Sequence, residues 1–291
     1  MKIAILFPGI GYHCDKPLLY YSGKLAAQHE YEVIKVSYKN LSRSIPEAYA
    51  DAYAQTETFL ENINWNQYEA ILFISKSIGT IIAAAYAQKH DIHCRNVYYT
   101  PLAQTFDFAP QSGIVFHGTK DSWVETDIIK KKCQEHHLPL HIVESTTHSL
   151  ELQADNDSAS SCMKSTVLQN LHILSNVMEL TEQYIAYGVY YRPLHADELN
   201  RELFRNFIRH QNVVKCRRKE DDKWVIKDAP FIDDWSEDDY QFLIKCLKNT
   251  VRTGGFVYAA FCSHSSGDLL KGFVSVEPTL FGGAQGYLDL S

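Results

Sequence analysis

The stretch Ala70-Ile-Leu-Phe-Ile-Ser-Lys-Ser-Ile-Gly-Thr-Ile-Ile-Ala-Ala-Ala85 decides the fold of this 291-residue chain. Its first half is an apolar run typical of a buried strand, and its alanine-rich second half predicts a helix. Ser77 lies between them, with Ser75 two residues before it and Gly79 two residues after it. Small residues at these two positions let a strand turn sharply into a helix, which holds the apex residue in a strained conformation at the carboxyl end of the sheet. The pattern makes Ser77 a candidate nucleophile.

Apolar runs on both sides of this stretch predict a parallel sheet. The predicted strands cover residues 3–7, 32–37, 71–74, 96–100, 114–116 and 140–143. Most gaps between them leave room for a helix, so the alternation indicates βαβ units with about six parallel strands and flanking helices, an α/β fold. In such a sheet, a functional site lies at the carboxyl ends of the strands.

The pattern changes after a predicted amphipathic helix over residues 164–186, and we place a domain boundary near Gly188. Beyond it, residues 189–194, 256–261, 270–276 and 287–290 predict strands, and residues 196–210 and 236–251 predict helices. A basic run followed directly by an acidic one predicts a solvated loop over residues 215–222. We therefore expect an α/β domain over residues 1–187 and a smaller α+β domain over residues 188–291.

Composition limits the classes of function. The chain is 45% hydrophobic and 22% charged, as is typical of a globular protein with a sizeable core. Its formal net charge of −7 argues against nucleic acid as a partner. The apolar run at residues 3–7 is too short for a signal peptide, and no run approaches the length of a membrane span. Seven cysteines without a Cys-x-x-Cys pair indicate neither a zinc site nor a disulfide framework, so we expect a cytoplasmic protein with reduced thiols and no membrane contact.

Two further residues complete a candidate catalytic triad with Ser77. A serine hydroxyl becomes nucleophilic when a neighbouring base takes its proton and a carboxylate orients that base. Asp121 follows the predicted strand at 114–116, and His148 follows the strand at 140–143, so the chain order is serine, acid, histidine. Taken singly, the serine could be a helix N-cap, the aspartate a turn former and the histidine a surface group. Asp107 is a weaker alternative acid because it comes earlier and away from a clear strand end.

The reaction also needs N–H donors for the developing oxyanion. The backbone N–H of Ile78 is one candidate, and that of Ile10, in the glycine-rich segment 7–12, is the other. A plain glycine turn is the alternative for this segment. Lys76 precedes the candidate nucleophile directly, but neighbouring residues on a tight turn diverge, so we expect a solvated lysine.

Three side chains near predicted strand ends are candidates for lining a substrate pocket: Tyr12, His13 and Trp123. Packing at the edge of the core is an equal alternative for them. The substrate class that fits the candidate triad is a small acyl compound.

With these motifs in view, residues 1 to about 187 resemble a compact α/β-hydrolase. Ser75-Lys-Ser-Ile-Gly79 is similar to the family's Gly-x-Ser-x-Gly turn, Gly118-Thr-Lys-Asp121 to its acid turn and Thr147-His-Ser149 to its histidine loop. The segment Pro8-Gly-Ile-Gly11 stands where the family has a His-Gly oxyanion segment, with proline in place of the histidine. The resemblance implies a serine hydrolase of carboxylesterase or acyl hydrolase type that needs no cofactor and has a rather open site.

Residues 188–291 resemble the first half of a GNAT-type acetyltransferase. Val189-Tyr-Tyr-Arg-Pro-Leu194 is similar to its opening strand, and Leu270-Lys-Gly-Phe-Val-Ser-Val276 and Tyr287-Leu-Asp-Leu290 are similar to two central strands. The family's pyrophosphate-binding loop would begin beyond Ser291, so we expect no usual acetyl-CoA binding by this chain. The alternative function is therefore an acyl-CoA-dependent N-acyltransferase activity of a C-terminal domain that is truncated here, and a binding scaffold is a third. An exposed last strand would favour a homo-oligomer.

Overall fold

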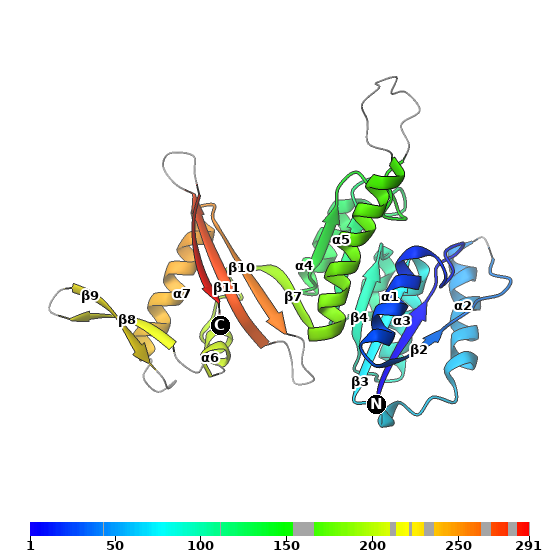
Figure 1. Ribbon diagram of the computed structural model, residues 1–291, viewed down its shortest axis with the longest axis horizontal. Coiled ribbons are helices and arrows are strands. Elements are labelled where there is room, and N and C mark those ends of the chain that lie inside the picture. Colours follow the sequence, from blue (N-terminus) through cyan, green and yellow to red (C-terminus); the bar gives the residue numbers. More distant parts are fainter. Residues whose placement is uncertain are drawn as a thin grey trace, which may run out of the picture. The chain divides into compact units, whose positions relative to one another are not determined.

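The computed structural model describes residues 1–42, 44–110, 112–153, 166–209, 214–220, 223–229, 236–262, 269–278 and 284–290. The chain forms two compact units, Met1–Gly188 and Val189–Ser291 (Figure 1). The first two residues of the helix predicted over 164–186, and the polar turn between the predicted strands 256–261 and 270–276, lie outside the described residues.

A six-stranded parallel sheet forms the centre of the first unit, and it confirms the predicted fold class. Its strands are β1 (Lys2–Phe7), β2 (Tyr31–Lys35), β3 (Ala70–Lys76), β4 (Arg95–Tyr99), β5 (Ile114–Gly118) and β6 (Leu140–Val143). They follow the order β2-β1-β3-β4-β5-β6, with every neighbouring pair parallel. The order reverses between β1 and β3, and in open α/β sheets ligands bind beyond the carboxyl ends of the strands at such a point. The strand β6 lies at one edge of the sheet and is only half-buried.

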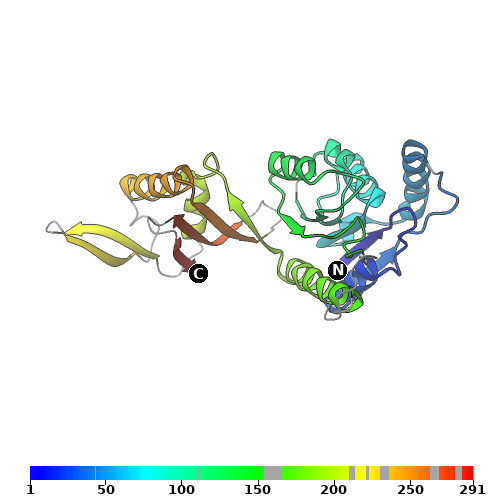
Figure 2. The ribbon, with the colours of Figure 1, turned by 90° about the horizontal axis from the view of Figure 1, so that it is seen from above.

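Helices cover both faces of this sheet, as Figure 2 shows. The helices α1 (Pro17–Gln28) and α5 (Thr166–Tyr187) pack together on one face. The other face carries α2 (Ile45–Leu60), α3 (Ile78–Lys89) and α4 (Thr126–Glu135), and the short 3₁₀ helices are η1 (Trp65–Gln67) and η2 (Ala103–Phe108). Strands covered on both faces need near-continuous apolar runs, and that is why residues 3–7 of β1 are all fully buried.

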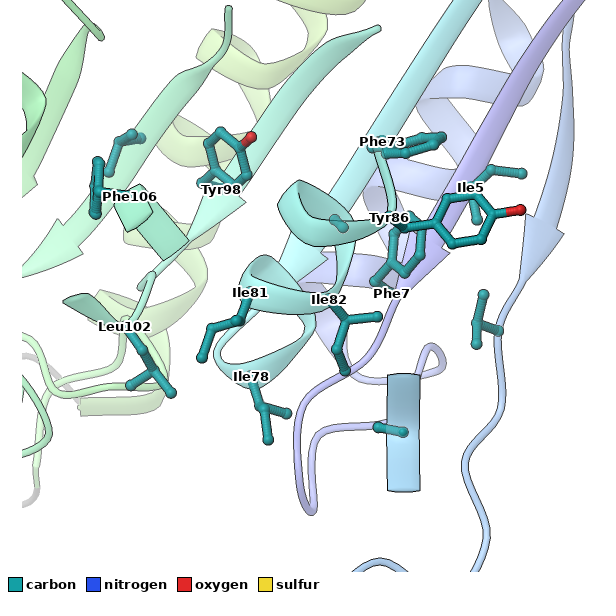
Figure 3. Close-up of a cluster of buried hydrophobic side chains, with 14 of the residues drawn as sticks. Ile5, Phe7, Phe73, Ile78, Ile81, Ile82, Tyr86, Tyr98, Leu102 and Phe106 are labelled. Carbon is teal, nitrogen blue, oxygen red and sulfur yellow. The ribbon is translucent and has the colours of Figure 1, made fainter. Parts of the chain in front are cut away.

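The helix α3 lies in the core of the first unit (Figure 3). Residues 78–86 are all buried, because the helix is apolar or small on every side and packs against the sheet, α2 and η2. Beneath it, the rings of Phe7 and Phe73 meet edge to face with centroids 4.9 Å apart. The start of α3 is therefore held by packing along the whole helix.

The second unit has a four-stranded antiparallel sheet in the order β12-β11-β10-β7. Its strands are β7 (Val189–Leu194), β10 (Phe256–Cys262), β11 (Leu269–Pro278) and β12 (Ala284–Leu290), and its helices are α6 (Arg201–Arg209) and α7 (Glu237–Arg252). A separate hairpin joins β8 (Val214–Glu220) to β9 (Lys223–Ala229). The predicted loop is therefore wrong over residues 215–220, since backbone pairing with β9 forms a strand despite the run of charged residues, and residues 221–222 lie outside the described residues.

None of the helices in the described part of the chain combines the length and apolar character that crossing a bilayer requires.

Candidate active site

The connection between β3 and α3 is a strained turn with Ser77 at its apex. Ser77 has φ 56° and ψ −125°, a backbone conformation that residues other than glycine seldom adopt. Its N–H donates to the carbonyl of Tyr99 at 3.1 Å, which ties the apex to the neighbouring strand. Strain of this kind persists where the surrounding structure over-determines it and is concentrated at functional sites.

Small residues on both sides allow this turn to close. Ser75 is fully buried, and its hydroxyl donates to the carbonyl of Val97 at 3.3 Å. A Cβ atom at Gly79 would lie 2.4 Å from the carbonyl oxygen of Phe7 and 2.6 Å from that of Pro8. The first turn of α3 therefore packs directly on the segment that leaves β1.

The three residues of the predicted triad come together at the carboxyl edge of the sheet. The hydroxyl oxygen of Ser77 lies 2.8 Å from Nε2 of His148, and Nδ1 of His148 lies 2.7 Å from Oδ2 of Asp121. Asp121 lies in the turn after β5, and His148 lies in the loop after β6. The other carboxylate oxygen of Asp121 accepts the N–H of Trp123 at 2.8 Å. The alternative acid, Asp107, lies in η2 and has no part in this chain of hydrogen bonds.

Burial and charge set the protonation states of this group. The Asp121 side chain has no exposed surface, which alone would raise its pKa, but the hydrogen bonds from His148 and the Trp123 amide outweigh burial and leave the pKa below its usual range. Burial lowers the pKa of His148, and the hydrogen bond to Asp121 acts in the opposite direction. At neutral pH the pair is therefore a carboxylate and a neutral imidazole, the state in which a histidine can accept a proton.

A second histidine, missed by sequence analysis, faces the same carboxylate. His117 in β5 is fully buried, and its Nδ1 lies 3.8 Å from Oδ2 of Asp121. Neither of its ring nitrogens has a hydrogen-bond partner in the described part of the chain. Burial lowers its pKa, so it is neutral beside the ionised aspartate. The sequence signal that could have identified His117 is that it is a titratable residue inside the apolar strand that leads to Asp121.

The expected solvation of Lys76 is wrong. Its side chain is 1% exposed, and its ammonium group donates to Oγ1 of Thr100 at 2.6 Å. The same group lies 5.2 Å from the centre of the Tyr12 ring. Lys76 is the last residue of β3 and pairs with Tyr99 of β4, so its backbone is fixed by the sheet and its side chain is buried instead of diverging into solvent.

The two candidate oxyanion donors come from the residue directly after Ser77 and from the loop after β1. Ile78 is the first residue of α3, where backbone N–H groups lack an intrahelical acceptor. In the loop after β1, the N–H of Gly9 is bonded to the carbonyl of Tyr12 at 3.0 Å, and a Cβ at Gly9 would lie 3.1 Å from that of Ser77. The following residue, Ile10, is 47% exposed.

The three candidate pocket residues differ in their surroundings. Tyr12 is half-buried, its hydroxyl accepts the N–H of Leu18 at 3.1 Å, and burial raises its pKa to about 12. Trp123 is 60% exposed, with its ring 5.8 Å from that of His148. His13 is exposed, and its Nδ1 accepts the N–H of Asp15 at 3.3 Å. Tyr12 and Trp123 thus contact residues of the site, whereas the contact found for His13 is local.

Within the described residues, no group of three or more His, Cys, Asp or Glu side chains could hold a metal ion.

Solved structures similar to this chain include an α/β serine hydrolase homologue from Coxiella burnetii, an α/β serine hydrolase without a lid from Xanthomonas campestris and an esterase from Pyrococcus furiosus. Their identities to this chain are 14%, 12% and 10%, with TM-scores of 0.44, 0.45 and 0.44. The alignments cover 63%, 63% and 61% of this chain, in its N-terminal part, and 84%, 79% and 81% of the respective neighbours. By sequence, no family model and no curated protein matches the chain.

Proposed function

We propose that the Met1–Gly188 unit is a serine hydrolase that cleaves an ester, thioester or amide through an acyl-enzyme at Ser77. One observation carries the proposal: the hydrogen-bond chain from the Ser77 hydroxyl through His148 to the buried carboxylate of Asp121, at 2.8 and 2.7 Å. Triads of this kind are recognised by geometry and roles, and the geometry of these hydrogen bonds supports the proposed roles.

In the acylation step the Ser77 oxygen attacks the carbonyl carbon of the substrate while its proton moves to Nε2 of His148. Asp121 stays ionised, holds the Nδ1–H of the ring and stabilises the imidazolium. The tetrahedral intermediate then collapses, the bond to the leaving alcohol, thiol or amine breaks, and His148 protonates that group. An ester of Ser77 and a neutral imidazole remain.

In the second step water hydrolyses this ester. The neutral His148 takes a proton from the water as the water oxygen attacks the acyl carbon, and the collapse of the second intermediate returns the proton to Ser77. The acid product leaves, and the site is restored without a cofactor.

The oxyanion of each intermediate needs preorganised donors. The N–H of Ile78 adjoins the nucleophile, and the N–H of Ile10 comes from the loop in which a Cβ at Gly9 would lie 3.1 Å from the Cβ of Ser77. Because Gly9 donates its own N–H to Tyr12, Ile10 is the better candidate in this loop. Typical losses on removing one such donor are about 10²–10³-fold in kcat.

A small acyl compound is the substrate class that this site would take. Trp123, next to His148, and Ile10, in the loop after β1, both have exposed side chains, so these candidate groups are open to solvent. Together with Tyr12 and His13, Trp123 forms the candidate lining of the acyl or leaving-group site.

Labelling by a fluorophosphonate tests the proposal. The wild-type chain should become covalently modified at Ser77, as located by peptide mass spectrometry, and should hydrolyse p-nitrophenyl acetate. Ser77→Ala should lose both labelling and hydrolysis. Ser75→Ala is the matched control, because it removes a buried hydroxyl of the same turn that donates only to a backbone carbonyl.

Wild-type protein that resists the probe and hydrolyses no short acyl ester would refute the proposal. Equal labelling of the wild type and Ser77→Ala would place the reactive residue elsewhere. An acyltransferase activity of the second unit and a homo-oligomeric state stay predictions from sequence.

A further inference from the structure

A buried lysine next to the proposed nucleophile has no part in the mechanism above. Lys76 is 1% exposed, and in the described part of the chain no carboxylate forms a direct ion pair with its ammonium group, although the charge of Asp121 acts on it from farther away. Burying an unpaired charge is costly, so such a group persists when polar partners compensate it. The hydroxyl of Thr100, at 2.6 Å, is the hydrogen-bond partner that it has.

Thr100 connects this lysine to the proposed catalytic histidine. Its hydroxyl donates to the backbone carbonyl of His148 at 3.0 Å. Because a hydroxyl has a single proton, the same oxygen must accept from Lys76. The contacts therefore form a directed chain from ammonium to hydroxyl to carbonyl, in which each bond polarises the next.

The backbone at Thr100 provides a second, independent observation. Thr100 follows β4 with φ 43°, which for a β-branched residue is an outlier. Its N–H donates to the carbonyl of Phe116 at 2.7 Å, and its side chain is fully buried. This strained backbone conformation directs the hydroxyl toward the loop after β6, which contains His148.

We propose that Lys76 is a positioning residue for His148. Its ammonium group orients the Thr100 hydroxyl, and that hydroxyl fixes the main chain of His148 so that the imidazole stays between Ser77 and Asp121. The consequence for turnover rests on the proposed function. The effect on the histidine itself is measurable without turnover.

The positive charge of Lys76 has a second effect, which is on the pKa of His148. Burial lowers the pKa of Lys76 to about 7, and Asp121 opposes that shift. Besides burial, the positive charge of Lys76 lowers the pKa of His148, against the pull of Asp121. The titratable groups facing the imidazole are thus Asp121, Lys76 and His117, and Lys76 also faces the ring of Tyr12. Since the charge of Lys76 lowers the pKa of His148, the protonation states of the two groups are coupled.

Four variants of the full chain separate these effects. Lys76→Met removes the charge and keeps an unbranched apolar stem. Thr100→Val removes the bridging hydroxyl and keeps the β-branched shape, whereas Thr100→Ser restores the hydroxyl. Thr56→Val in α2 is the control, because it also removes a fully buried threonine hydroxyl, one bonded to Ala52 and Tyr38 away from the site.

NMR titration of the His148 imidazole is the primary measurement. We expect its apparent pKa to rise by about one pH unit or more in Lys76→Met, because the like charge that disfavours the protonated imidazole is removed. Thr56→Val should leave it unchanged. An unchanged His148 pKa in Lys76→Met would overturn the electrostatic part, whether or not the protein is a hydrolase.

Hydrolysis of p-nitrophenyl acetate tests whether Lys76 and Thr100 position His148. Thr100→Val should lower kcat/KM about 10-fold or more, of the order seen when an orienting contact is lost, and Thr100→Ser should retain most of it. Thr100→Val as active as the wild type would overturn the positioning role, even if Lys76→Met failed to fold. A wild type that neither reacts with the fluorophosphonate nor hydrolyses esters would refute the proposed function instead, while the titration still decides the inference.

Discussion

Replacing Gly79 by alanine tests how closely the first turn of α3 packs on the segment after β1. The added Cβ would lie 2.4 Å from the carbonyl oxygen of Phe7, 2.6 Å from that of Pro8 and 2.8 Å from the carbonyl carbon of Phe7. Ordinary contacts of this kind begin at 3.4 Å. The overlap is with backbone on a fully buried strand end, which no side-chain rotation can relieve.

The expected loss of stability combines two opposing contributions. Alanine in place of glycine inside a helix gains about 1 kcal/mol. Overpacking of a rigid core costs about 1–3 kcal/mol, and contact with two carbonyl groups puts this site at the upper end. The net loss is therefore about 2 kcal/mol, or a decrease in Tm of about 4–8 °C for a unit of this size. Because the displaced segment leads into the loop that carries Ile10, kcat/KM for p-nitrophenyl acetate should fall about 10-fold or more.

The matched control is Gly23→Ala in α1. There the added Cβ would lie 3.0 Å from Cδ2 of Leu6, the end of a flexible side chain, and 3.6 Å from the next atom. Calorimetry of the full chain should show a Tm within about 3 °C of the wild type for this variant, since helix propensity and a mild contact offset each other. If Gly79→Ala has the same Tm and the same kcat/KM as Gly23→Ala, the close packing at the turn does not maintain the geometry of the site.

Two further predictions concern acid–base chemistry. Asp121→Asn removes the charge that orients His148 and should lower kcat by about 10³–10⁴-fold with little change in KM, as steady-state kinetics would reveal; a loss below tenfold would contradict the role of Asp121. Burial lowers the pKa of His141 to about 4, so between about pH 6.5 and 4 the unfolded chain binds a proton that the folded chain does not. The stability that this difference gives is present above about pH 6.5 and is lost as the pH falls to about 4. The urea midpoint of unfolding should therefore depend less on pH in His141→Gln than in the wild type. An equal dependence of the midpoint on pH in the two proteins would exclude His141 as a cause.

Much of the first unit was predictable because its signals are local. A strand buried on both faces needs an uninterrupted apolar run, so β1, β3 and β5 stand out in the sequence, and Ser77 is marked by the small residues on both sides of it. The ends of parallel strands lie at one edge, so chain order alone was enough to place Asp121 and His148 near Ser77.

The environment of Lys76 could not be predicted in this way. Its partner, Thr100, comes from the end of a neighbouring strand, and the hydroxyl reaches it because of a backbone conformation that no sequence pattern indicates. His117 was hidden for a related reason, since an apolar strand run gives no sign that one member faces a carboxylate across the turn. The hairpin of β8 and β9 is stabilised by pairing of its two backbones, and this pairing overrides the charged composition.

The edge position of β6 has a consequence for how the protein would respond to mild denaturing stress. Among the described residues this strand pairs on one side only, with β5, and all four of its residues are half-buried. Edge strands with little burial open at lower free energy than the core. Opening of β6 would carry the loop with His148 away from Ser77 while α3 and the central strands stayed folded. Amide hydrogen exchange should therefore be faster in β6 than in β3, and catalytic competence would be governed by this local equilibrium before global unfolding begins.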